Sequence, residues 1–299
     1  MNPPELKTKL RGIHAYAVTP FKSDYVLDLE GLRQNIEFVA ASGVHVIVVA
    51  GGTGEIFSLE PDEYQQVVRV AVQGAAGRVP VVAGVGFNSR LAPRMAREAE
   101  SAGADGLLVM PPYFVKPGDD GVIAYVREIA EQVKLGLSLY SGSTLVYHPE
   151  LVARLTEIPS VVGFKSEDGD VKLFERIRNR VGDRLTWICG MAEGEAHLYF
   201  SVGAEAVTSG IANFAPRWSL AVYEAAVVSD FATVRELIRT RVGPITNLRA
   251  KRPGYYTPVV KAAMDMLGLA GGFPRPPLLP ILEHDRNELH GILKEMELL

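Results

Sequence analysis

Residues 161–165 read VVGFK, a short apolar run that ends in a lysine. The length and β-branched composition of Val161–Phe164 are typical of a buried parallel strand. Lysine is among the side chains least often fully buried, so Lys165 either reaches solvent along its apolar stem or takes part in chemistry. A lysine that is desolvated by an apolar strand loses affinity for its proton. Its neutral amine can then attack a ketone to form a Schiff base.

Similar apolar runs recur along the chain, and the segments between them have the apolar spacing of amphipathic helices. Asp28 and His148-Pro149 are typical of helix starts, and Gly43 is typical of a helix end. The other predicted strands are Ala15–Val18, Val44–Ala50, Val79–Val85, Gly106–Met110, Leu135–Tyr140, Thr186–Cys189 and Ala204–Thr208. The predicted helices between them are Leu29–Ala41, Asp62–Val72, Ala92–Ala102, Gly121–Val133, Pro149–Thr156, Val171–Arg180 and Glu193–Val202.

This alternation of strands and helices predicts an α/β fold, a closed (β/α)8 TIM barrel. A doubly wound sheet is the alternative, but it would usually carry a dinucleotide loop after its first strand. The chain offers only Gly84-Val85-Gly86, which is interpreted as a tight strand exit. We expect residues 1–215 to form the barrel. Residues 216–299 would supply its last helix and a C-terminal helical extension, with helices at Phe231–Arg241, Pro258–Leu267 and His284–Leu298.

The composition and charge of the chain bear on which partners it can bind and in which compartment it is expected. The net charge of −4 gives no electrostatic case for binding nucleic acid or an anionic membrane. The single cysteine, Cys189, permits no intrachain disulfide, is expected to be a small core residue and suits a cytoplasmic location. The N-terminus lacks the apolar segment of a signal peptide, and no run reaches the roughly 18 apolar residues of a membrane span. The six histidines show no zinc-ligand spacing, so no metal or cofactor is expected.

Active sites of this barrel type lie at the C-terminal ends of the strands, so the residues there are the candidates. GGTGE at 51–55 follows the second strand and could form an anion nest in which Thr53 adds a hydroxyl donor. Such a nest suits one carboxylate of a small acid, and an ordinary glycine-rich turn is the alternative. Glu167, Asp168 and Asp170 follow the sixth strand, where acids are more often loop or helix-capping residues than magnesium ligands.

Three other strand ends supply candidates near the lysine. The fifth strand is predicted to end at Tyr140, whose phenol could relay a proton if a neighbouring charge lowers its pKa. A tyrosine with a purely structural place at the barrel rim is the alternative. The seventh strand ends before Gly190 and the eighth at Thr208-Ser209, and these small residues leave room above Lys165.

Taken together, these strand ends resemble the dihydrodipicolinate synthase/N-acetylneuraminate lyase family of class I Schiff-base lyases. The resemblance implies that Lys165 forms a Schiff base with a 2-keto acid, that Tyr140 shuttles protons and that the usual active form is a homotetramer. The residues implied to hold the keto-acid carboxylate or to line the pocket are Gly52, Thr53, Gly190 and Thr208. It rests on VTPF at 18–21, GGTGE at 51–55, PPY at 111–113, Tyr140, GFK at 163–165 and PVVK at 258–261.

The chain departs from the synthases of this family at three positions. Their motif at 51–55 has two adjacent threonines, where this chain has Gly52 first. A tyrosine that they receive from a neighbouring subunit for the proton relay is matched by Phe114. An arginine that grips a substrate carboxylate, shortly after the fifth-strand tyrosine, is matched by about Leu145. These losses argue against lysine-pathway synthesis.

GGTGE, PPY and the segment Asn247–Tyr255 are similar to 5-dehydro-4-deoxyglucarate dehydratases of the same family, which dehydrate and decarboxylate a sugar diacid. Those enzymes commonly have Tyr-Asn-Arg in the fifth strand, whereas this chain has Tyr140-Ser141-Gly142. Glu167 would repel a nearby carboxylate and favour hydroxyls. The distal carboxylate or hydroxyls are expected to contact Ser141, Ser143, Thr144, Ser166 or Glu167, and Ser209 is a further expected substrate-binding residue.

The sequence therefore predicts a homo-oligomeric lysine Schiff-base lyase acting on a small-molecule 2-keto acid. A decarboxylating dehydratase of a keto-deoxy sugar acid, such as 5-dehydro-4-deoxyglucarate, is the preferred interpretation. A dihydrodipicolinate synthase-type or other pyruvate-dependent aldol lyase is the alternative. A non-catalytic barrel that binds a keto acid as a sensor is a more remote one. The distal half of the substrate and its stereochemistry stay open at this point.

Overall fold

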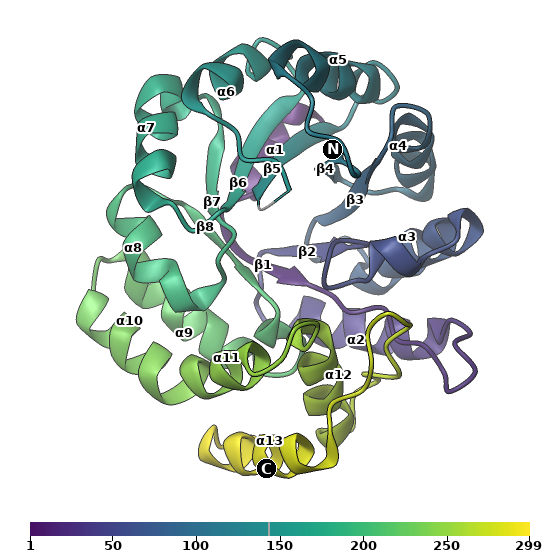
Figure 1. Ribbon diagram of the computed structural model, residues 1–299, viewed down its shortest axis with the longest axis vertical. Coiled ribbons are helices and arrows are strands. Elements are labelled where there is room, and N and C mark those ends of the chain that lie inside the picture. Colours follow the sequence, from purple (N-terminus) through teal and green to yellow (C-terminus); the bar gives the residue numbers. More distant parts are fainter. Residues whose placement is uncertain (143) are drawn as a thin grey trace.

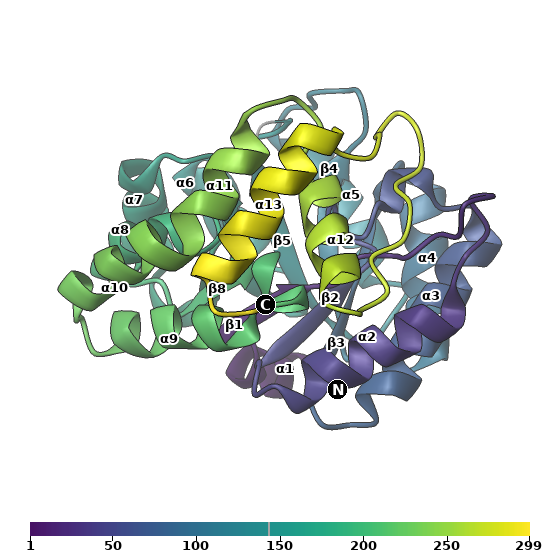
Figure 2. The ribbon, with the colours of Figure 1, turned by 90° about the horizontal axis from the view of Figure 1, so that it is seen from below.

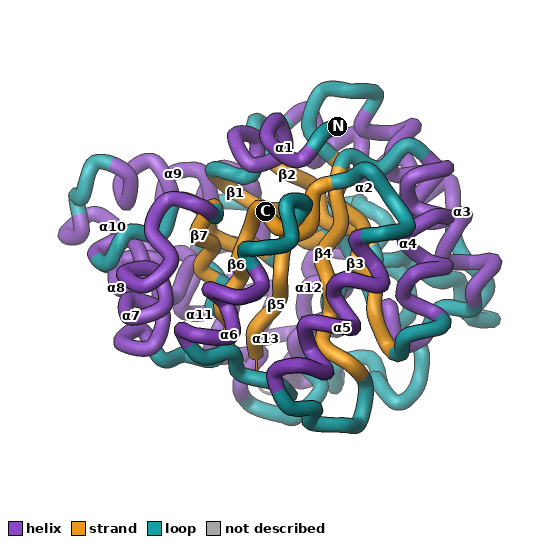
Figure 3. The backbone as a smooth tube through the Cα atoms, turned by 90° about the horizontal axis from the view of Figure 1, so that it is seen from above, coloured by secondary structure: helices purple, strands orange, loops and turns teal. Residues whose placement is uncertain are grey.

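The computed structural model describes residues 1–142 and 144–299, and over these residues parallel strands form a closed barrel in the order β1 to β8. Figure 3 shows the strands from above, enclosed by helices. Because β1 pairs in parallel with β8, the predicted (β/α)8 fold is confirmed and the doubly wound alternative is wrong. The strands are β1 Gly12–Tyr16, β2 Val46–Val49, β3 Val81–Phe87, β4 Gly106–Pro112, β5 Gly136–Gly142, β6 Val161–Glu167, β7 Thr186–Cys189 and β8 Ala206–Ser209.

A helix follows each strand and packs on the outside of the barrel (Figure 1). The apolar side of α2, which includes Leu32 and Ile36, is buried as its spacing predicts. Asp28 caps α2 by accepting a hydrogen bond from the Gly31 N–H at 3.0 Å. These barrel helices are α2 Leu29–Ala41, α3 Pro61–Ala75, α4 Leu91–Ala102, α5 Asp119–Ala130, α6 Pro149–Leu155, α7 Val171–Val181, α8 Ala196–Ser201 and α9 Pro216–Val227.

The strands that carry the candidate residues are longer than predicted. β5 continues past Tyr140 to Gly142, and β6 continues past Phe164 to Glu167. The pairing of Tyr140 with Lys165 lies within this extension of the ladder. The prediction ended each strand where its apolar run stopped. Polar side chains can face a cavity while their backbone stays in the ladder, so hydrophobicity alone does not mark the end of these strands.

Gly84 lies within β3, so its interpretation as a strand exit is wrong. A Cβ built at this position would lie 2.0 Å from the carbonyl oxygen of Ala50. Glycine is therefore required here, because the backbone of β3 passes directly against the end of β2. This close approach brings β3 against the start of the glycine-rich turn at residues 51–55.

A helix that the sequence pattern did not predict, α1 Pro3–Lys9, closes the N-terminal end of the barrel. Its Leu6 is fully buried, and Cβ atoms built on Gly106 and Gly136 would lie 2.4 and 2.7 Å from the Leu6 side chain. Figure 1 shows α1 behind β5 and β6. The strands of the barrel are thus covered at their N-terminal ends, and the candidate residues lie at the opposite ends.

After α9 the chain forms a helical extension that packs on one side of the barrel. Its helices are α10 Phe231–Leu237, α11 Gly243–Ala250, α12 Tyr256–Met266 and α13 Glu283–Glu295. The helix α11 was not predicted, and a π-helical stretch at Ile238–Val242 joins it to α10. Figure 2 shows α13 lying against α11 and α12. Through α12 this extension reaches the C-terminal ends of the barrel strands.

Candidate active site

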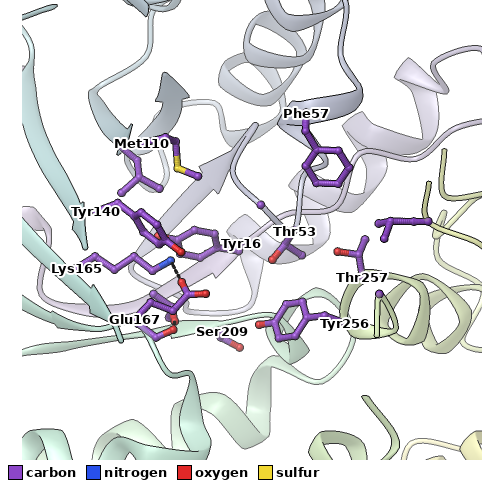
Figure 4. Close-up of a pocket in the computed structure, with 16 residues that line it drawn as sticks. Tyr16, Thr53, Phe57, Met110, Tyr140, Lys165, Glu167, Ser209, Tyr256 and Thr257 are labelled. Carbon is purple, nitrogen blue, oxygen red and sulfur yellow. Dashed lines mark hydrogen bonds and ion pairs between the residues drawn. The ribbon is translucent and has the colours of Figure 1, made fainter. Parts of the chain in front are cut away.

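A cavity of about 260 Å³ lies at the C-terminal ends of the strands (Figure 4). Each of the eight residues proposed as catalytic or substrate-binding lines it except Ser141. Its walls come from barrel strands and from residues of the C-terminal extension. The lining residues are Tyr16, Gly52, Thr53, Phe57, Leu108, Met110, Tyr140, Lys165, Glu167, Gly190, Thr208, Ser209, Gly254, Tyr256, Thr257 and Leu278.

Lys165 lies at the base of this cavity and is only 5% exposed, so the interpretation that its ammonium reaches bulk solvent is wrong. Its Nζ contacts Oε2 of Glu167. It also lies 4.3 Å from the ring centre of Tyr140 and 4.7 Å from that of Tyr16. Burial lowers the pKa of Lys165, and the negative charge of Glu167 partly opposes that effect. The arrangement therefore favours a neutral amine more than a solvated lysine would.

Tyr140 pairs with Lys165 across β5 and β6, so both side chains project into the barrel at the same level. Burial, followed by the charge of Glu167, raises the pKa of Tyr140. The predicted relay was conditional on a neighbouring charge that lowers this pKa, and the charge of Glu167 raises it instead. The phenol therefore stays protonated at neutral pH and is suited to donating a hydrogen bond. Its hydroxyl lies over Gly142, and a Cβ built on Gly142 would lie 2.6 Å from the hydroxyl oxygen of Tyr140.

The turn at residues 51–55 forms one wall of the cavity. Thr53 is 6% exposed and lines the cavity, and a Cβ built on Gly52 would meet no atom within 4 Å. The turn closes through a hydrogen bond from the Glu55 N–H to the Gly52 carbonyl at 3.1 Å. Glu55 has a left-handed backbone with φ of 52°, and its Oε1 lies 2.5 Å from Nζ of Lys261 on α12. A buried ion pair therefore fastens this turn to the C-terminal extension.

The opposite wall consists of small residues, as the sequence predicted. A Cβ built on Gly190 would lie 2.4 Å from the carbonyl oxygen of Ser166, so only glycine fits at this position. The Thr208 hydroxyl donates to the Gly190 carbonyl at 3.1 Å. Ser209 lines the cavity, but its hydroxyl hydrogen-bonds with Ser219 at 2.9 Å and accepts the Ala212 N–H at 2.8 Å. This wall therefore supplies space rather than free hydroxyl donors.

Ser141 and Ser166 do not line the cavity, contrary to the prediction. Successive strand residues point to opposite sides, so these serines face outward where Tyr140 and Lys165 face inward. Their hydroxyls donate to Oδ2 of Asp168 at 3.3 and 3.1 Å. Of the other predicted contacts of the distal substrate, Glu167 lines the cavity, Thr144 does not, and Ser143 lies outside the described residues.

Three acidic residues follow Lys165 along the chain, and each has a different structural role. Asp170 caps α7 by accepting the Leu173 N–H at 2.9 Å, as predicted. Asp168 is a loop residue held by serine hydroxyls and by the Asp170 N–H at 3.0 Å. Glu167 instead ends β6 and lines the cavity, so its interpretation as a loop or capping residue is wrong.

The sequence reasoning missed Tyr16, Tyr256 and a buried arginine beside the cavity. Figure 4 shows Tyr256, from the start of α12, across the cavity from Lys165. Arg249 is 8% exposed, and its guanidinium carbon lies 4.2 Å from the ring centre of Tyr256. Among the described residues its Nε and Nη2 have no hydrogen-bond partner. The only sequence signal was the similarity of Asn247–Tyr255 to sugar-diacid dehydratases, which does not show where the arginine lies.

The guanidinium of Arg249 lies directly behind the end of β8. A Cβ built on Gly210 would be 2.8 Å from Nη2 of Arg249 and 3.1 Å from the Tyr256 hydroxyl. A second buried charge lies in the same region, since the Glu193 carboxylate accepts the Ser219 hydroxyl at 2.6 Å. Burial raises the pKa of Glu193, and the positive charge of Arg249 opposes this. A buried cation with unused donors therefore lies behind this side of the cavity.

The described residues hold no cluster of three or more His, Cys, Asp or Glu side chains that could bind a metal ion. Cys189 is buried, as expected for a core residue, and burial raises the pKa of its thiol. Over the part of the chain that the structure describes, none of the helices has the length and apolar character to cross a bilayer.

The comparisons with known proteins agree on one family. The model of the dihydrodipicolinate synthetase family matches residues 9–296. A relative from Bradyrhizobium diazoefficiens, named probable 5-dehydro-4-deoxyglucarate dehydratase, is 37% identical over 99% of this chain and 96% of its own length. A relative of the same name from Rhodococcus opacus is 38% identical, over 99% of this chain and 98% of its own length.

Solved structures give the same result at lower identity. The dihydrodipicolinate synthase from Oceanobacillus iheyensis superposes with a TM-score of 0.92 and 29% identity, over 99% of both chains. The dihydrodipicolinate synthase from Bacillus clausii has a TM-score of 0.91 and 29% identity, over 98% of this chain and 99% of its own. The similarity therefore extends over the barrel and the C-terminal helices together.

Proposed function

The chain belongs to the dihydrodipicolinate synthetase family and is a lyase, and we propose that it acts on a 2-keto acid through a Schiff base on Lys165. The observation that carries this proposal is the burial of Lys165 at the base of the cavity, where its pKa is lowered. A neutral amine is the form that attacks a ketone. Gly52 and Thr53 would hold the carboxylate next to the ketone, and Tyr140 would donate a hydrogen bond to its oxygen.

Within this class we propose a decarboxylating dehydratase of a keto-deoxy sugar diacid. The iminium carbon would draw electrons from its neighbour, which loses a proton, and the hydroxyl on the next carbon would leave as water. The distal carboxylate would then leave as carbon dioxide, with its electron pair passing into the extended iminium. Relatives at 37–38% identity over 99% of the chain carry the name of such a dehydratase, which supports this choice.

The charges around the cavity also support a diacid. Lys165 is the only cation among the described residues that line the cavity itself. Arg249 lies behind Tyr256 on the opposite side, with two guanidinium nitrogens that have no partner among the described residues. Buried donors without partners are uncommon in folded proteins. The positive charge of this guanidinium would attract a distal carboxylate bound on the Tyr256 side of the cavity, in place of the fifth-strand arginine that the chain lacks.

The direct test is reduction with borohydride in the presence of substrate, followed by mass spectrometry of the peptide that contains Lys165. The panel consists of 5-dehydro-4-deoxyglucarate, a keto-deoxy sugar monoacid, and pyruvate with aspartate semialdehyde. We expect a covalent adduct on Lys165 and release of carbon dioxide from the diacid alone. Lys172→Ala, on the exposed start of α7, is a matched control that should keep full activity. Absence of any adduct on Lys165 would refute the Schiff-base mechanism.

We also propose that the protein assembles as a homotetramer. Tyr113, Phe114 and Val115, which follow β4, are 73%, 92% and 58% exposed in the single chain. Three consecutive exposed apolar residues are typical of a surface that a partner covers. Sedimentation equilibrium should give a mass near four times that of the chain, and a monomeric mass would contradict this proposal.

A further inference from the structure

We propose that Glu167 carries protons for Lys165, accepting one as the imine forms and returning it to the departing hydroxyl. The inference rests on the proposed function, because it assumes that Lys165 attacks a ketone. Glu167 and Lys165 are two residues apart on β6, so their side chains project to the same side of the strand. Oε2 of Glu167 contacts Nζ of Lys165, and the Glu167 side chain is 39% exposed within the cavity wall. The carboxylate therefore reaches both the lysine and the cavity.

The neighbouring acids cannot take this role in their observed positions. Asp168 accepts hydrogen bonds from Ser141, Ser166 and the Asp170 backbone, and it lies outside the cavity lining. The Asp170 carboxylate is used at the N-terminus of α7. Among the described residues that line the cavity, Glu167 is the only carboxylate.

The phenols of the cavity are poor proton acceptors in this environment. Burial raises the pKa of Tyr140 and of Tyr16, and the charge of Glu167 raises both further. Each phenol therefore stays protonated and can donate a hydrogen bond without removing a proton from an ammonium group. A carboxylate in contact with Nζ meets the geometric requirement for a general base.

The proton balance closes with this single carboxylate. The Lys165 ammonium gives a proton to Glu167, and the neutral amine forms a carbon–nitrogen bond with the ketone. A proton moves from nitrogen to the former carbonyl oxygen, which gives a carbinolamine. The protonated Glu167 then donates to the carbinolamine hydroxyl, the carbon–oxygen bond breaks, and water leaves. The products are an iminium on Lys165, one water molecule and Glu167 as a carboxylate again.

The same carboxylate can serve the elimination that follows. It accepts the proton from the carbon next to the iminium and so generates an enamine. It then donates that proton to the hydroxyl on the adjacent carbon, which leaves as water while the iminium reforms in conjugation with the new double bond. Lys165 carries one positive charge at the beginning and end of each stage, so Glu167 returns each time to the same electrostatic partner.

A passive role as a counterion predicts the opposite kinetic result. Glu167 raises the pKa of Lys165 against the effect of burial. If Glu167 did no more than this, its removal would increase the neutral fraction of Lys165 and accelerate imine formation at low pH. If Glu167 carries the proton, its removal slows imine formation at every pH, even though more of the lysine is neutral.

The experiment measures the rate of imine formation with pyruvate, trapped by cyanoborohydride, as a function of pH. Glu167→Gln should form the imine about 10²–10⁴-fold more slowly than the unmodified protein. Glu167→Asp keeps a carboxylate and should recover part of the rate, and added formate should accelerate Glu167→Gly in a saturable way. Glu175→Gln on the exposed side of α7 is the matched control.

The outcomes separate this inference from the proposed function. Trapping by Glu167→Gln at an undiminished or increased rate, with an adduct on Lys165, would overturn the role of Glu167 and leave the Schiff-base proposal intact. Absence of an adduct in the unmodified protein would overturn both. Thermal melting of each variant identifies any loss of folding, and the formate effect on Glu167→Gly gives a readout that a structural role would not produce.

Discussion

Replacement of Lys261 by methionine should destabilise the protein strongly, because it leaves a buried carboxylate without its cation. Nζ of Lys261 lies 2.5 Å from Oε1 of Glu55, and the two side chains are 1% and 0% exposed. Lys261 also donates a hydrogen bond to the Phe273 carbonyl at 2.9 Å. Methionine has a similar length and no charge, so the change removes the ion pair with little change in packing.

The expected loss follows from the partners that remain. Removing one member of a buried ion pair typically costs about 3–5 kcal/mol. Oε2 of Glu55 still accepts the Arg275 N–H at 3.0 Å in the variant, so one oxygen keeps its partner. The expected loss is therefore at the lower end, about 3 kcal/mol of the free energy of unfolding. That is a large fraction of the roughly 5–15 kcal/mol by which folded proteins are usually stable.

Urea denaturation at a fixed protein concentration measures this loss, and a double-mutant cycle isolates the pair. Glu55→Gln combined with Lys261→Met removes both charges, and the double variant should be more stable than Lys261→Met alone. Arg239→Met is the matched control, because its ion pair with Glu236 is 71% and 59% exposed and should contribute little to stability. A loss below about 1 kcal/mol in Lys261→Met, or a double variant no more stable than the single one, would refute the reasoning.

The same substitution should affect the cavity as well as stability. Glu55 closes the turn that contains Gly52 and Thr53, and Lys261 fastens that turn to α12. If this turn holds the keto-acid carboxylate, Lys261→Met should raise KM for the keto acid more than it lowers kcat, measured below the unfolding transition. The double variant should recover part of the lost affinity, because its turn no longer contains an unpaired charge.

Two further predictions concern the barrel interior and the phenol of the site. Burial lowers the pKa of His14 to about 4, so the folded state prefers neutral His14. The free energy of unfolding should therefore fall by up to about 3 kcal/mol as the pH decreases from the unfolded-state pKa of about 6.5 through 4. In His14→Gln this decline should be smaller. Identical pH profiles for the variant and the unmodified protein would contradict the role of His14. Tyr140→Phe removes the hydrogen bond to the substrate oxygen and should slow turnover by about 10²–10³-fold while borohydride still traps an adduct on Lys165, whereas full turnover would remove Tyr140 from the mechanism.

The barrel and the central part of the site could be predicted from the sequence because both depend on local patterns. Alternating apolar runs and amphipathic segments specify the (β/α)8 fold, and this fold places strand ends together at one side. Lys165, Tyr140, Gly190 and Thr208 each follow or end such a run, so their meeting at one cavity follows from the topology. The extent of the strands was less predictable, since polar residues continue β5 and β6.

Other parts of the site depend on contacts that no local pattern encodes. The side chain of Ser141 points away from the cavity because β5 continues two residues past Tyr140, and side chains alternate between the two faces of a strand. The apolar pattern did not predict this continuation. Tyr256 reaches the cavity, and Arg249 lies behind it, only because the C-terminal helices fold back over the barrel. Glu167 looked like one acid of three in a loop, and only the continuation of β6 brings it beside Lys165.

The charges on the two sides of the cavity give the proposed reaction a direction. Lys165 and Glu167 form a pair whose total charge is unchanged when the ammonium becomes an iminium, so that side holds the intermediates without a change of charge. On the other side, the positive charge of Arg249 behind Tyr256 would attract the distal carboxylate until it leaves as carbon dioxide. The product would then lack the group that Arg249 attracts, and its affinity should be lower than that of the substrate. Decarboxylation would in this way promote product release.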